Sequence, residues 1–271
     1  MIRALLPHLL SIGFLSASPS IAAQSPGDES REGARAVEVA SVSDDARKVL
    51  DRSIEAMGGQ DALESIQSSR STCHLALGEV ETTMVMLTRK PDLFLSRHRI
   101  EGLGTMEMGF DGVRGWRRDP PDGILSEIDS AEATDFASRL DLQAMVRAPE
   151  RTYREVSRLP DEIDGERGFA VLLMRNEERS ARLRFDQETG LLDSIELVDP
   201  GARARNRRIV VVDWSDPGRM MPLRWVRVFR IEQPRETLTV TYDYVTFDDV
   251  SESTFIAPHE LPDPEGAPAF E

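Results

Sequence analysis

Cysteine is almost absent from this sequence, since Cys73 is the only one. No disulfide can therefore form within the chain, and its stability must come from a packed core. Cys73 lies between Thr72 and His74 in a stretch of residues typical of strands. This context predicts a small buried thiol.

Positive charge is also scarce. The 271 residues include 33 Lys and Arg against 48 Asp and Glu, which gives a formal net charge of −15 at pH 7. Such a balance repels nucleic acids and anionic lipid surfaces at long range, so no nucleic-acid partner is expected. A local exception is the cluster of Arg203, Arg205, Arg207 and Arg208. It is interpreted as a charged strand edge that blocks aggregation, and the alternative is an anion-binding site.

Long apolar runs are missing as well. No stretch reaches the roughly 18–20 continuous apolar residues that a membrane-spanning helix needs. A shorter apolar run, Ala4 to Leu15, follows the basic start Met1-Ile2-Arg3 and precedes the small residues of Ser20-Ile21-Ala22. This order is typical of a signal peptide, so we expect residues 1–22 to be removed and the mature protein to be soluble in the periplasm.

Catalytic and metal-binding motifs are absent too. The sequence has no G-x-S-x-G elbow, no H-E-x-x-H, no Walker loop and no G-x-G-x-x-G. His74, His98 and His259 have no Cys, Asp or Glu at metal-ligand spacing, which favours structural or surface roles. The expectation is a protein that is not an enzyme and has no metal and no cofactor.

The chain divides by composition into four parts. Residues 1–22 form the expected leader, 23–43 a polar flexible tether, 44–258 one folded domain and 259–271 an acidic tail. The domain starts with a helix, because Ser43 can cap an acidic first turn and Gly58-Gly59 can end it. A second short helix is expected at Asp61 to Ile66.

From Arg70 onward the pattern is that of strands. Turn sequences such as Asp164-Gly165 and Thr189-Gly190 recur every 10–14 residues or so, and this spacing predicts an antiparallel meander. One further helix is expected at 131–147, capped by Ser130. A dozen or so strands must curl. The predicted fold is therefore mainly β: a single curved antiparallel sheet, an unclosed β-barrel with helices packed in or over its concave face.

The candidate site is a methionine-rich face of this sheet. Met106, Met108 and Phe110 alternate with polar or small residues, and Met84 and Met86 share one face of an earlier strand. Methionine adapts to irregular apolar shapes, so this face is either an ordinary core or a surface that opens to an acyl chain. The expected helix at 131–147 would add two apolar side chains to the site, Phe136 and Leu140.

Two details refine this picture. Val85 and Leu87 make the opposite face of the first methionine strand apolar too, so it needs a cover on each side, from helices, a ligand or a lid. If Asp111-Gly112 is a two-residue hairpin loop, Phe110 faces Val113 and Glu107 faces Trp116. Trp116 would then lie on the side opposite to Met106.

The order of several short motifs resembles the outer-membrane lipoprotein-sorting, LolA/LolB-like superfamily of periplasmic proteins. These motifs are Met57-Gly58-Gly59 with Ala62-Leu63, Lys90-Pro91-Asp92, Phe110-Asp111-Gly112 with Trp116, Phe185-Asp186 with Thr189-Gly190-Leu191, and Phe247-Asp248-Asp249-Val250 with Phe255.

The resemblance implies a hydrophobic cavity beneath a helical lid. It also implies a non-enzymatic carrier or sensor of lipid or lipoprotein acyl chains. Envelope membrane proteins are further candidate partners, and a monomer is expected. The alternative is an envelope protein-interaction or structural module with the same fold and a filled core.

Overall fold

The computed structural model describes residues 40–90, 92–129, 142–176, 180–198, 207–218, 223–234, 236–256 and 258. Apart from Ala40, all of them belong to one unit that begins at Ser41. Phe136 and Leu140 of the predicted site, the expected leader and the expected acidic tail lie outside the described residues.

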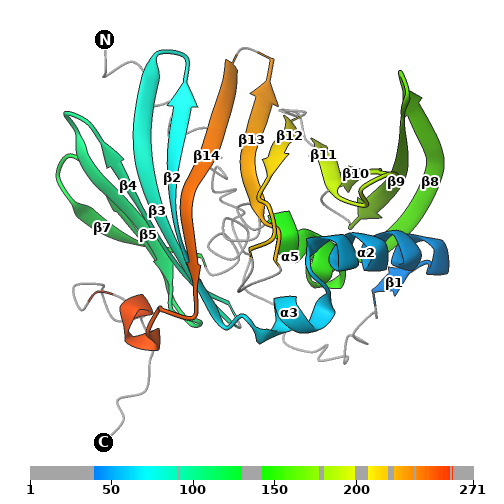
Figure 1. Cartoon of the computed structure of the whole chain (residues 1–271). Helices are drawn as coiled ribbons and strands as arrows, with labels where there is room; N and C mark the ends of the chain where they lie inside the picture. Colours follow the sequence, from blue (N-terminus) through cyan, green and yellow to red (C-terminus); the bar gives the residue numbers. More distant parts are fainter. Residues whose placement is uncertain are drawn as a thin grey trace, which may run out of the picture. The chain divides into compact units, whose positions relative to one another are not determined.

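One sheet dominates this unit (Figure 1). Its strands are β1 (Ser41–Val42), β2 (Ser68–Leu77), β3 (Val80–Arg89), β4 (Leu93–Ile100), β5 (Gly104–Phe110), β6 (Gly115–Asp119), β7 (Ile124–Ile128), β8 (Glu155–Asp164), β9 (Arg167–Arg175), β10 (Ser180–Asp186), β11 (Leu192–Val198), β12 (Arg207–Trp214), β13 (Val226–Gln233) and β14 (Glu236–Phe247). Their order across the sheet is β1-β8-β9-β10-β11-β12-β13-β14-β2-β3-β4-β5-β6-β7. The two ends of this order, β1 and β7, do not pair with each other in the described part of the chain, so the curved sheet stays open.

The predicted mainly β fold with a single curved, unclosed sheet is confirmed. Neighbouring strands pair antiparallel, with one departure: β1 runs parallel to β8. The interpretation of the arginine stretch as a strand edge is wrong for Arg207 and Arg208, because β12 lies inside the sheet between β11 and β13. Arg203 and Arg205 lie outside the described residues.

The first helix forms where its caps predict it. In α2 (Asp44–Met57) the Ser43 hydroxyl accepts a hydrogen bond from the Ala46 backbone N–H at 3.3 Å, and Gly58 ends the helix with φ 126°. The other helices within the described ranges are α3 (Gln60–Ser65), α5 (Leu142–Arg147) and two 3-10 turns, η1 (Pro149–Arg151) and η2 (Glu252–Phe255). Of the helix expected at 131–147, α5 is the described part.

α2 packs against β8, α5 and the turn between β10 and β11. Arg52 donates to the backbone oxygens of Gln187 and Glu188 in that turn. Gly190 lies directly beneath the helix, where an added Cβ would come within 3.1 Å of Arg52 Cγ, and its φ of +75° also favours glycine. These contacts tie α2 to one end of the sheet (Figure 1).

An apolar row crosses the sheet in strict register. Its members lie directly opposite one another on neighbouring strands: Leu172, Leu183, Ile195, Ile209, Ile231, Leu238 and Leu77. We call the side of the sheet that carries this row the inner face. The other side, the outer face, carries cross-strand ion pairs such as Arg182–Glu196 and Arg208–Glu232.

The outer face of β9 and β10 contains one buried ring, Phe169. The guanidinium carbon of Arg184 lies 3.9 Å from its centroid and that of Arg167 lies 4.9 Å away. Arg184 also pairs with Glu162, 3.4 Å away. Stacked guanidinium groups therefore cover this ring, and no apolar segment is needed. None of the helices in the described ranges is long and apolar enough to cross a membrane.

Candidate functional site

The five predicted site residues that the structure describes share the inner face. Met84 and Met86 come from β3, and Met106, Met108 and Phe110 come from β5. β4 lies between these two strands, so its inner-face side chains separate the methionines of β3 from those of β5. All five are buried.

Three inner-face residues of β4 lie between the predicted site residues, and the sequence did not single them out for the site. His98 lies directly opposite Met84 on one side and Met106 on the other. One step along the strand, Ser96 stands between Met86 and Met108. The third is Phe94, which lies opposite Phe110. The alternation of Phe94, Ser96 and His98 was visible in the sequence, but their strand neighbours were not.

His98 is a buried polar residue on this largely apolar face. Its Nε2 is hydrogen-bonded to the hydroxyl of Thr82 on β3. Burial lowers the pKa of His98, because an imidazolium would lose hydration there. The ring is therefore neutral near pH 7.

Cys73 continues the same row on β2, directly opposite Met84. Its thiol lies 3.5 Å from the Met84 backbone oxygen. Burial raises the pKa of Cys73 to about 12, and the carboxylate of Asp243 adds to this shift. The predicted buried thiol is confirmed, and it is a poor nucleophile because it stays protonated.

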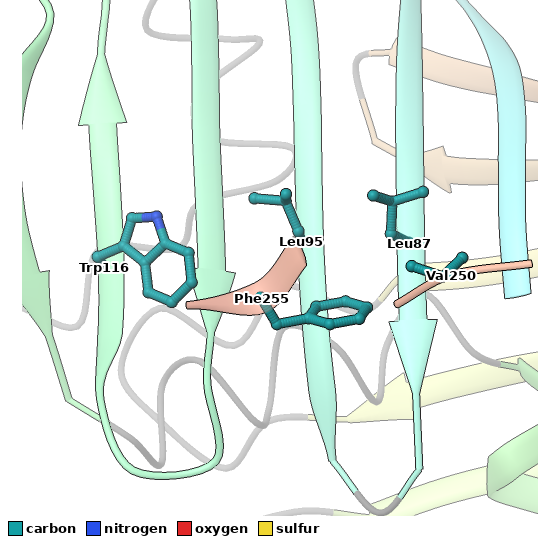
Figure 2. Packing of buried hydrophobic residues seen from close by; sticks show 5 residues of the cluster. All are labelled: Leu87, Leu95, Trp116, Val250 and Phe255. Carbon is teal, nitrogen blue, oxygen red and sulfur yellow. The ribbon is translucent and has the colours of Figure 1, made fainter. Parts of the chain in front are cut away.

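Part of the outer face of β3–β6 is also apolar. Leu87, Leu95 and Trp116 are buried there beneath Val250 and Phe255 from the C-terminal segment. Figure 2 shows η2 crossing these strands, with Phe255 next to Leu95. β3 was predicted to need a cover on each side. On the outer side, this C-terminal segment is the cover.

Polar contacts hold that segment in place. The Asp248 carboxylate accepts hydrogen bonds from the backbone N–H groups of Gln67 and Ser68, at 2.6 and 3.1 Å. Arg89 donates to the Val250 backbone oxygen at 3.0 Å. These contacts join the C-terminal segment to the start of β2 and to the end of β3.

Trp116 lies on the outer face, as predicted, but the register behind that prediction is wrong. Phe110 pairs with Gly115, and Gly109 pairs with Trp116, so the loop spans 111–114. The Asp111 carboxylate accepts hydrogen bonds from the backbone N–H groups of Val113 and Arg114, at 2.9 and 2.7 Å. These side-chain bonds stabilise a longer loop than the two-residue turn.

The described residues hold no group of three or more His, Cys, Asp and Glu arranged to bind a metal ion. Chemically, the inner face of β3–β5 offers thioethers, two aromatic rings, hydroxyls and one imidazole. It is suited to apolar or soft ligands.

Three solved structures share this architecture. A DUF1329 family protein from Desulfovibrio piger superposes with a TM-score of 0.54 and 12% identity, over 79% of this chain and 98% of its own. A domain named for outer membrane lipoprotein sorting, from Vibrio parahaemolyticus, gives 0.55 and 13% over 77% and 96%. A LolA superfamily protein from Nitrosomonas europaea gives 0.53 and 13% over 78% and 97%.

The chain has the LolA-like fold. The predicted resemblance is confirmed for the fold. Sequence identities of 12–13% support a similarity of fold only. No family model matches the sequence. No curated protein matches it either.

Proposed function

We propose that this protein is a periplasmic, non-enzymatic carrier or sensor that binds lipid or lipoprotein acyl chains on its methionine-rich inner face. The observation that carries the proposal is the shared inner face of Met84, Met86, Met106, Met108 and Phe110. Phe136 and Leu140 are proposed to join them. The LolA-like fold and the leader-like sequence of residues 1–22 support the compartment and the ligand class.

The energetics suit reversible binding. Each buried methylene of an acyl chain contributes about 0.8 kcal/mol. Methionine is flexible and polarizable, so its face can repack around chains of different length and close again after release. Lipids, lipoproteins and envelope membrane proteins are the proposed partners of a monomeric protein.

The first experiment is native mass spectrometry of protein freshly purified from the periplasmic fraction. Co-purified lipid is expected, together with a mass that lacks the leader. A full-length product in the membrane pellet would contradict the proposed compartment. Purified protein that carries no lipid and also fails to bind a fluorescent fatty acid would contradict the ligand class.

Two double variants then locate the site. Met106→Asp with Met108→Asp should abolish lipid binding in a protein that still folds, because each charge would occupy a site without water. If the face is a sealed core, as in a structural module, the same pair should unfold the protein, since a buried unpaired carboxylate costs several kcal/mol.

The conservative pair Met106→Leu with Met108→Leu removes flexibility at nearly constant volume. A destabilisation below about 1.5 kcal/mol is expected, with a shift in the preferred chain length. Thermal melts and fatty-acid displacement are measured on the same samples. Unchanged binding in both folded pairs would place the ligand on another face.

A further inference from the structure

Three side chains form a compact row on the inner face: Met84 on β3, His98 on β4 and Met106 on β5. The register places His98 directly opposite both methionines. Directly opposite residues have Cβ atoms about 4.5–5.5 Å apart, close enough for long side chains to converge on one point. The fold thus brings together two thioethers and an imidazole from positions 84, 98 and 106.

The inner-face residues that flank this row on its own three strands are uncharged, whereas the neighbouring strand β6 places Arg117 opposite Met108, where it forms an ion pair with Asp119 at 2.9 Å. The flanking residues on the three strands are Thr82, Met86, Ser96, Ile100 and Met108. Hard cations such as Ca²⁺ and Mg²⁺ need several oxygen ligands, which a methionine face does not supply. Thioether sulfur is a soft ligand that selects monovalent copper, and imidazole also suits copper.

Thr82 completes the arrangement. When His98 Nε2–H donates to the Thr82 hydroxyl, Nδ1 keeps its lone pair for a ligand. Metal-binding imidazoles nearly always donate their other N–H to a neighbouring acceptor, which orients the ring. The hydrogen bond seen here supplies that acceptor.

We propose that His98 Nδ1 and the sulfur atoms of Met84 and Met106 bind one monovalent copper ion, with silver(I) as an equivalent soft ion. Met86 and Met108 lie one step along the same face, where they can exchange with the first pair as ligands. This site goes beyond the proposed acyl-chain function and does not depend on it.

The test is an anaerobic copper(I) titration of the delipidated mature protein against the chromophoric chelator bicinchoninate. One equivalent of copper is expected to transfer to the protein. Met84→Leu with Met106→Leu should weaken binding at least tenfold, and Thr82→Val by about tenfold through the ring orientation. The matched control is Met174→Leu on β9, a fully buried methionine of the same face outside this row, which should leave copper binding unchanged.

Two results would overturn the site. One is no transfer of copper to the wild-type protein, and the other is equal binding by wild type and the Met84→Leu, Met106→Leu double variant. Cys73→Ala should retain copper binding, and its loss in this variant alone would assign the ion to the thiol instead. Thr82 is not among the proposed lipid-binding residues, so Thr82→Val should still bind a fluorescent fatty acid as the wild type does while it loses copper affinity, and the two proposals can therefore fail separately.

Discussion

The inner face of β9–β11 and the inner face of β3–β5 belong to one sheet but differ in composition. On β9–β11 it carries Leu172, Leu183 and Ile195, all 0% exposed. On β3–β5 it carries Met84, Met86 and Met106, which remain 6%, 8% and 8% exposed. Met108 of the second group is 1% exposed, so both regions are buried, and they differ chiefly in side-chain type: branched aliphatic groups in one and flexible thioethers in the other.

Their covers differ as well. α2 packs against β8 and the β10–β11 turn at the aliphatic end. At the methionine end, the C-terminal segment covers the outer face with Val250 and Phe255. We therefore expect the aliphatic region to contribute more to the stability of the fold than the methionine region, whose side chains are more flexible.

The largest expected effect of a single substitution is in the aliphatic region. Leu183→Ala should lower the free energy of unfolding by about 4 kcal/mol, because it leaves a cavity that fully buried neighbours cannot fill. Urea unfolding measures the loss. A loss below about 1 kcal/mol would show that this region is not the rigid part of the sheet.

The next effect concerns the outer cover. Phe255→Ala should cost about 3 kcal/mol, somewhat less than a central cavity, because a surface segment can partly relax. The neighbouring exposed Ile256→Ala is the matched control and should change stability by under 0.5 kcal/mol or so. Equal values for the two variants would mean that the segment does not stabilise β3–β6.

A smaller effect tests the packing beneath that cover. Gly109→Ala should cost about 2 kcal/mol, since the new Cβ would lie 2.2 Å from Trp116 Cζ2 and the indole ring must move. Gly168→Ala on β9 is the control, because its nearest neighbour is the flexible end of Gln187. Tryptophan fluorescence should change in the first variant only.

The smallest effect is a pH dependence. Because burial lowers the pKa of His98 in the folded state, the unfolded chain binds the proton more readily. This contribution to stability is full above about pH 6.5 and decreases as the pH falls toward the lowered pKa, by at most about 1.4 kcal/mol per pH unit. Unfolding of His98→Asn measured from pH 7.5 to 5 should show a shallower decline than wild type. Parallel declines would contradict the assignment to His98.

Local signals predicted much of this fold. The capping residue Ser43 and the glycine pair at 58–59 mark the ends of α2. The predicted turn sequences Asp164-Gly165 and Thr189-Gly190 lie where β8 leads into β9 and where β10 leads into β11. Helix caps and turns depend on interactions between residues a few positions apart, so they can be predicted from a short stretch of sequence.

Long-range features were not predictable in this way. The parallel pairing of β1 with β8 joins residues more than 100 positions apart. The loop at 111–114 was predicted two residues too short, because hydrogen bonds of the Asp111 side chain outweighed the dipeptide preference. The motif Phe247-Asp248-Asp249-Val250 with Phe255 was visible in the sequence, but its place as a cover over Leu87 and Leu95 was not.

By itself, the sequence determined which residues form strands, which side of each strand is apolar and where the methionines fall. Period-two alternation and turn chemistry act over a few residues and are legible without the fold. Only the tertiary structure decided that His98 stands between Met84 and Met106, and that Phe255 closes the outer face. Register between strands and the docking of a distant segment depend on the free energy of the whole packed sheet, which no local window contains.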